Sequence, residues 1–179
     1  MNNELVIVLD FGGQYNQLIA RRVREANVYC EVLSYKTPLE RIKEKRPKGI
    51  IFTGGPASVL DPGAPFCDSG IFSLDIPILG ICYGMQLMSV MLGGGVEKAD
   101  QREYGKMNVE LVSDCCLFNG IEANTTCWMS HTYFVNKMPE GFTKTAFSPN
   151  CPTAAMEDLK RRLYAVQFHP EVMHTPKGK

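Results

Sequence analysis

Hydrophobic and polar positions follow two different periods in the first half of the chain. Short apolar runs, typical of buried strands, occur at residues 5–9, 28–33, 49–52 and 76–81. Apolar residues at helical spacing occur at residues 15–26 and 87–92, and the short charged stretch 38–45 is also expected to be a helix. Because strands and helices alternate, the pattern predicts an α/β fold with an open, mostly parallel sheet and helices on both faces.

The pattern changes after Gly95, where short strand-like stretches are separated by glycine or proline turns. They occur at residues 104–112, 127–129, 142–146, 154–156 and 164–168. We expect this half to add antiparallel strands and to return one or more of them to the main sheet. A chain of 179 residues without repeats or linkers predicts a single domain over residues 1–179.

Charge and cysteine content exclude several classes of function. Lys plus Arg and Asp plus Glu both number 19, so no basic excess favours a nucleic-acid partner, and the run 160–162 is expected to be a solvated turn. The first apolar run is too short for a signal peptide or a membrane span, which predicts a cytoplasmic protein without a membrane partner. Seven cysteines without a C-x-x-C pair argue against a disulfide framework and a metal site.

Cys82 lies where a predicted strand meets a predicted helix, with Gly80 two positions before it and Gly84 two positions after it. The same frame presents the nucleophilic serine of many hydrolases on a strained turn. Free N–H groups and the dipole at a helix N-terminus stabilise a thiolate. A single cysteine is more often a small buried residue, so the frame favours a nucleophile without excluding a packing role.

A candidate base and a candidate acid follow the last predicted strand, at His169 and Glu171. Histidine can take a proton from a thiol, and a carboxylate can orient the ring and stabilise its charged form. Alone, this His-Pro-Glu segment could be a strand end with a surface glutamate. Its presence in one chain with Cys82 favours a catalytic pair.

Four segments that follow predicted strands should meet at one edge of a parallel sheet, where ligands bind in such folds. They are residues 10–14, 53–56, 82–84 and 169–171. The first lacks the glycine pattern and the lysine of a phosphate-binding loop, which argues against nucleotide binding there. The backbone N–H groups of Gly55 and Tyr83 could stabilise an oxyanion, and Gln86 lies one helical turn after Cys82. His131 is a rival base, but no acidic residue is near it in the sequence.

Several motifs together resemble the class I glutamine amidotransferase family, whose fold is flavodoxin-like. They are D-F-G-G-Q-Y, T-G-G-P, G-I-C-Y-G-M-Q, M-S-H and V-Q-F-H-P-E-V, and they cover essentially the whole chain in order. The text of the first helix is most similar to the amidotransferase domain of GMP synthetases. The resemblance implies that L-glutamine is the substrate and that no cofactor serves the glutaminase step.

The resemblance also implies roles for individual residues. Cys82 would be the nucleophile, His169 the base and acid, and Glu171 the orienting carboxylate. Gly55 and Tyr83 would form the oxyanion hole. The amino-acid end of glutamine would lie against Gln86, Ser130, His131, Thr132 and Tyr133.

The same resemblance implies a partner. Ammonia would pass to an ATP-pyrophosphatase (synthetase) domain, which uses ATP and magnesium to convert xanthosine monophosphate to GMP. These 179 residues do not include that domain, so we expect a fragment of a longer enzyme rather than a separate subunit. Anthranilate, CTP and carbamoyl-phosphate synthases carry similar domains, and a catalytically silent regulatory subunit is another alternative. Thr132 and Tyr133 stand where bacterial GMP synthetases usually have Gly-Asp, so glutamine affinity or coupling to the partner is expected to differ.

Overall fold

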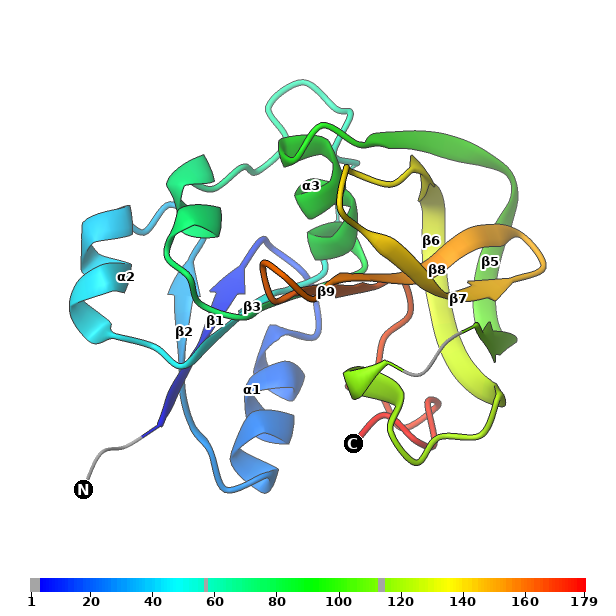
Figure 1. Cartoon of the computed structure of the whole chain (residues 1–179), viewed down its shortest axis with the longest axis horizontal. Coiled ribbons are helices and arrows are strands. Elements are labelled where there is room, and N and C mark those ends of the chain that lie inside the picture. The colour runs from blue at the N-terminus through cyan, green and yellow to red at the C-terminus, as the bar shows by residue number, and fades with distance from the viewer. Residues whose placement is uncertain (1–3, 57, 113–114) are drawn as a thin grey trace.

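A computed structural model describes residues 4–56, 58–112 and 115–179, and its described strands form one sheet of nine (Figure 1). The strands are β1 (Leu5–Asp10), β2 (Tyr29–Ser34), β3 (Gly49–Phe52), β4 (Ile78–Ile81), β5 (Gly95–Leu111), β6 (Asn124–Lys137), β7 (Thr143–Ser148), β8 (Cys151–Asp158) and β9 (Leu163–Val166). The α-helices are α1 (Asn16–Glu25), α2 (Leu39–Lys45) and α3 (Tyr83–Met91). Two short 3-10 helices lie at Ser69–Ser73 and Cys116–Phe118.

The strand order is β2-β1-β3-β4-β9-β8-β7-β5-β6. Neighbours from β2 to β9 pair in parallel, and neighbours from β9 to β6 pair antiparallel. Helix α1 lies on one face of the sheet, and α2 and α3 lie on the other (Figure 1). The predicted α/β class, the helices on both faces and the antiparallel additions are therefore confirmed.

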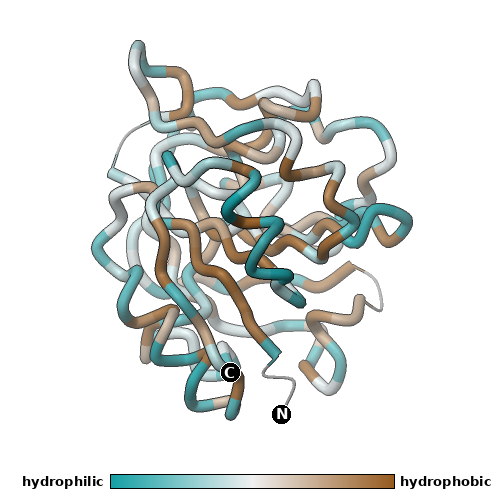
Figure 2. The backbone as a smooth tube through the Cα atoms, turned by 90° about the vertical axis from the view of Figure 1, so that its left-hand side faces the viewer, coloured by the Kyte–Doolittle hydropathy of each residue, from teal (hydrophilic) through white to brown (hydrophobic). Residues whose placement is uncertain are grey.

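Each parallel strand supplies side chains to two separate cores, because successive residues of a strand point to opposite faces. In β1, Ile7 and Leu9 belong to the core that includes Met85 of α3, whereas Val8 belongs to the core that includes Ile19 of α1. Figure 2 shows hydrophobic residues concentrated along inner stretches of the chain and hydrophilic residues on outer segments. The uninterrupted apolar runs seen in the sequence are thus explained by burial on both faces.

The two longest strands extend well beyond their predicted bounds. The sequence predicted strands at 104–112 and 127–129. In the structure, β5 and β6 form an antiparallel ribbon whose pairing runs from Gly95 opposite Lys137 to Glu110 opposite Asn124. In β5 only Ala99, Glu103 and Val109 are buried, and in β6 buried and partly buried positions alternate from Cys127 to His131, so no apolar run marks the length of the ribbon. By contrast, the basic run 160–162 lies in the turn between β8 and β9, as predicted.

Among the described residues, no helix combines the length and the apolar character that crossing a membrane requires.

Gly84 should tolerate no side chain, because α3 begins against the end of β3. A Cβ atom at Gly84 would lie 2.6 Å from the backbone oxygen of Phe52 and 2.7 Å from its Cβ. We expect Gly84→Ala to lower the free energy of unfolding by about 1–3 kcal/mol, measured by urea denaturation. Gly49→Ala is the control, since its Cβ would come only within 3.7 Å of Val6. Equal stability of the two variants would contradict this close packing.

Candidate active site

A cleft of about 250 Å³ lies at the carboxyl ends of the parallel strands. All four segments predicted to converge contribute to it, through Gly13, Gln14, Gly54, Gly55, Pro56, Cys82, His169 and Glu171. The predicted convergence is therefore present in the structure. Tyr15, Tyr104 and Ser130 complete the lining.

Cys82 occupies a sharp turn between β4 and α3. Its φ is 52° and its ψ is −106°, a conformation that a residue with a side chain adopts only under strain. A Cβ at Gly80 would lie 2.7 Å from the backbone of Gly84, so the two flanking glycines let strand and helix approach closely. The Cys82 sulfur faces the cleft, where Gln167 Nε2 lies 3.6 Å and the Ser130 carbonyl oxygen 3.8 Å from it. The geometry is that of a nucleophile elbow.

Pairing between β4 and β9 brings the cysteine and the histidine together. Ile81 is the register partner of Val166, and the Cys82 N–H donates a hydrogen bond to the Val166 carbonyl at 2.8 Å. His169 lies three residues after Val166, at the same edge of the sheet. A Cβ at Gly54 would lie 3.3 Å from His169 Cε1 and 3.9 Å from Cys82 Cβ, so this glycine leaves the space between them open.

His169 and Glu171 form a buried pair. The distance from His169 Nδ1 to Glu171 Oε1 is 2.7 Å, and both side chains are buried. Burial by itself lowers the pKa of His169, but its interactions with Cys82 and Glu171 outweigh burial and raise that pKa to about 10. At neutral pH the ring is therefore an imidazolium beside the Cys82 sulfur and the Glu171 carboxylate.

Contacts from three other segments fix the loop that carries this pair. The His169 N–H donates to the Trp128 carbonyl at 2.9 Å, and Thr175 Oγ1 donates to the His169 carbonyl at 2.7 Å. Arg22 Nε of α1 donates to the Glu171 carbonyl at 2.9 Å. None of these contacts was predicted, because their partners are distant in the sequence and carry no motif.

Gly55 and Tyr83 stand side by side at the cleft. A Cβ at Gly55 would lie 3.1 Å from Tyr83 Cγ and 3.1 Å from the Phe11 carbonyl oxygen, so the position needs glycine. Tyr83 is the first residue of α3, and helix geometry leaves its N–H without an intrahelical acceptor. Both N–H groups belong to backbone beside Cys82, and their service as oxyanion donors stays a prediction.

A smaller cavity of about 140 Å³ adjoins the cleft and shares part of its lining, including Gly55, Cys82 and Ser130. Its lining includes Gln86, Ser130, His131, Thr132 and Tyr133, all the residues predicted to hold the amino-acid end of a substrate. Contact with a substrate stays a prediction for each of them.

Hydrogen bonds organise the wall of this cavity. Gln86 Nε2 donates to the Tyr133 carbonyl at 2.8 Å and to Gln167 Oε1 at 3.2 Å. The Thr132 hydroxyl is 3.0 Å from the Tyr104 hydroxyl. Sequence reasoning missed Gln167 and Tyr104.

His131 is engaged by its own neighbours rather than placed as a free base. Its Nδ1 is 3.0 Å from the Tyr133 carbonyl oxygen, and its Nε2 is 3.2 Å from Glu103 Oε2. Glu103 is its register partner across the β5–β6 ribbon. The acidic partner that is missing near His131 in the sequence is therefore supplied by the neighbouring strand.

Two groups of described residues bring possible metal ligands within 4.8 Å of one another, and neither includes Cys82 or His169. They are Glu103, His131 and Cys151, and Cys115, Cys116 and Glu157. In the first group both nitrogens of the His131 ring already face protein oxygens. The reactive side chains that line the cleft are the thiol of Cys82, the imidazole of His169 and the carboxylate of Glu171.

Comparison with known proteins agrees with this geometry. The sequence model of the family "Glutamine amidotransferase class-I" matches residues 7–179. The chain is 72% identical over 179 residues to GMP synthase [glutamine-hydrolyzing] of Acetivibrio thermocellus, covering all of this chain and 35% of that protein. It is 62% identical over 175 residues to the protein of the same name from Clostridium perfringens, covering 98% of this chain and 34% of that protein. The chain thus spans about a third of the length of these relatives.

Solved structures show the same fold. A protein named as a GMP synthase subunit from Thermoplasma acidophilum superposes with a TM-score of 0.89 at 29% identity, covering 99% of this chain and 89% of that one. A glutamine amidotransferase from Thermotoga maritima superposes with a TM-score of 0.74 at 22% identity, covering 96% of this chain and 78% of that one. On the match over residues 7–179, this chain belongs to the class I glutamine amidotransferase family.

Proposed function

We propose that this chain hydrolyses L-glutamine to glutamate and ammonia through a thioester on Cys82. The observation that carries the proposal is the single cleft in which the elbow cysteine faces His169, with Glu171 bound behind the ring. Membership of the glutamine amidotransferase family supports glutamine as the substrate. A silent regulatory subunit is disfavoured, because it would have no need for an intact cysteine, histidine and glutamate in this arrangement.

In the first half-reaction, the Cys82 thiolate attacks the side-chain amide carbon of glutamine. The resulting oxyanion accepts hydrogen bonds from the Gly55 and Tyr83 backbone N–H groups. His169 donates its proton to the amide nitrogen, the carbon–nitrogen bond breaks, and ammonia leaves. A γ-glutamyl thioester and a neutral His169 remain.

In the second half-reaction, neutral His169 takes a proton from water while the water oxygen attacks the thioester carbon. The carbon–sulfur bond breaks, glutamate leaves, and Cys82 returns as a thiolate beside a protonated His169. Glu171, in contact with Nδ1 of His169, orients the ring and stabilises its charged form at each stage. The raised pKa of His169 fits this cycle, because the ring starts and finishes as the acid.

The acceptor of the ammonia follows from the relatives. Both curated relatives are named GMP synthase [glutamine-hydrolyzing] and are about three times as long as this chain. We infer that this chain supplies ammonia to an ATP- and magnesium-dependent synthetase domain that converts xanthosine monophosphate to GMP, in the cytoplasm. That domain would belong to the same longer chain, although the Thermoplasma relative carries the name of a subunit. Neither curated relative's name favours an anthranilate, CTP or carbamoyl-phosphate acceptor.

Labelling by a glutamine-like electrophile tests the nucleophile. Wild type should gain one adduct by intact mass, mapped to Cys82, and Cys82→Ala should gain none. His169→Ala should slow the reaction about 100-fold or more, because the sulfur loses its proton partner. Cys127→Ala, which removes a buried cysteine outside the cleft, is the matched control and should label as wild type does. An adduct on another cysteine, or none on folded wild type, would sink the proposal.

The pH dependence of stability tests the His169 pair. Its folded pKa of about 10 exceeds the ordinary value of 6.5, so bound proton stabilises the folded state. This contribution is complete below about pH 6.5 and is lost as the pH rises through about 10. The advantage of wild type over His169→Gln in free energy of unfolding, measured by urea denaturation, should therefore shrink across this range. A constant difference would show that the folded and unfolded states bind this proton equally.

A further inference from the structure

His131 presents both ring nitrogens to oxygen atoms that accept hydrogen bonds. The Tyr133 carbonyl oxygen, 3.0 Å from Nδ1, can only accept. A carboxylate oxygen of Glu103 lies 3.2 Å from Nε2. A neutral imidazole has one N–H, so with Glu103 ionised it would leave one of these contacts without a proton. When Glu103 is ionised, both contacts are hydrogen bonds only if both nitrogens carry protons.

Glu103 is surrounded by donors, which favours its ionised form. Ser148 Oγ lies 2.9 Å from each carboxylate oxygen, and the Asn150 N–H donates to Oε1 at 3.2 Å. Burial alone would raise the pKa of Glu103, but the hydrogen bonds from His131, Ser148 and Asn150 lower it. Cys151 is a third member of this buried cluster, and burial raises the pKa of its thiol to about 12, so it stays neutral. Tyr104 and Tyr133 line the same cavity as His131. Within the cluster the ring therefore faces one carboxylate.

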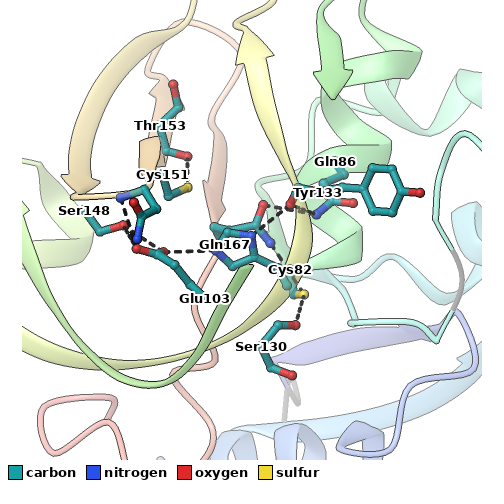
Figure 3. A network of polar contacts seen from close by, with 11 residues as sticks. Cys82, Gln86, Glu103, Ser130, Tyr133, Ser148, Cys151, Thr153 and Gln167 are labelled. Carbon is teal, nitrogen blue, oxygen red and sulfur yellow. Dashed lines mark hydrogen bonds and ion pairs between the residues drawn. The ribbon is translucent and has the colours of Figure 1, made fainter. Parts of the chain in front are cut away.

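The pair connects to the sulfur through a continuous run of hydrogen bonds, part of which Figure 3 shows from Glu103 and Ser148 to Cys82. The Tyr133 carbonyl accepts from both His131 and Gln86 Nε2. Gln86 also donates to Gln167, whose own Nε2 donates to the Cys82 sulfur at 3.6 Å. The buried pair thus holds the backbone at Tyr133, and that backbone holds the Gln86 amide at the wall of the smaller cavity.

We propose that Glu103 and His131 form a buried carboxylate–imidazolium pair that positions the Tyr133 carbonyl and Gln86 for binding of the substrate's amino-acid end. Glu103 and His131 act here as positioning residues, through Tyr133 and Gln86. The pair is formed by register partners on two antiparallel strands, where side chains on the same face lie close together. Desolvation of both charges is offset by the hydrogen bonds that Glu103 accepts. This inference rests on the proposed glutaminase function for its substrate, but not for the protonation state.

Nitrogen NMR of the histidine rings tests the protonation state in wild type. The chain has only three histidines, so His169→Gln and His174→Gln variants assign the signals. His131 should show the signature of two protonated nitrogens at neutral pH, because both nitrogens face hydrogen-bond acceptors. A neutral ring at that pH would overturn the proposal.

Labelling kinetics with the glutamine-like electrophile test the positioning role. His131→Phe should raise the half-saturating concentration about tenfold and change the maximal labelling rate much less, because the lost hydrogen bonds orient binding rather than the sulfur. His131→Asn, which retains a donor toward the Tyr133 carbonyl, should recover most of the affinity. Glu97→Gln is the matched control, since exposed Glu97 also accepts a hydrogen bond across the β5–β6 ribbon, from Asn136.

The two proposals fail in different ways. If wild type is not labelled at Cys82, the glutaminase function fails, while the NMR result still decides the state of His131. If wild type is labelled but His131→Phe saturates like Glu97→Gln, the positioning role fails and the function stands. If His131→Asn saturates no better than His131→Phe, the bond to the Tyr133 carbonyl is not what positions Gln86, and the proposal also fails.

Discussion

The parallel pairing of β4 with β9 is the constraint on which the candidate site depends. One hydrogen bond, from the Cys82 N–H to the Val166 carbonyl, joins the end of the strand before the cysteine to the end of the strand before the histidine. The chain between them includes the whole β5–β8 region, which must fold back to return β9 to the centre of the sheet. The proximity of sulfur and imidazole is therefore a property of the completed sheet and not of any local segment.

The site includes features that oppose stability. Cys82 holds a strained backbone conformation, and the Oε2 atom of Glu171 is buried without a hydrogen-bond partner among the described residues. A Cβ at Gly13 would lie 2.5 Å from the Gly54 carbonyl oxygen, so the two loops beside the cleft are also packed as closely as glycine allows. Two hydrophobic cores, one on each face of the sheet, hold these elements in place. The strain lies where the sulfur must reach the cleft and the ring must be charged.

Much of the fold and the centre of the site could be predicted from sequence, because the signals for them lie within a few consecutive residues. Examples are the apolar runs of β1 and β3 and the glycines on either side of Cys82. The ribbon of β5 and β6 could not be predicted at full length. Its strands are defined by their pairing with each other, and their sequences contain no long apolar run that would mark them. Glu103 was missed for the same reason: only the register of the ribbon places it opposite His131. Arg22 was missed because its bond is to a backbone carbonyl.

The cleft is assembled from both halves of the sheet. The parallel half supplies Cys82 and His169, whereas the antiparallel ribbon supplies Ser130, Tyr104 and the carbonyl of Tyr133. The predicted roles of reactivity and recognition therefore lie on separate stretches of the chain. If the ribbon side chains contact the substrate as predicted, their substitution would change which amide is admitted without replacing the sulfur or the imidazole. With such a division, related proteins could diverge in substrate preference while they retain the same nucleophile.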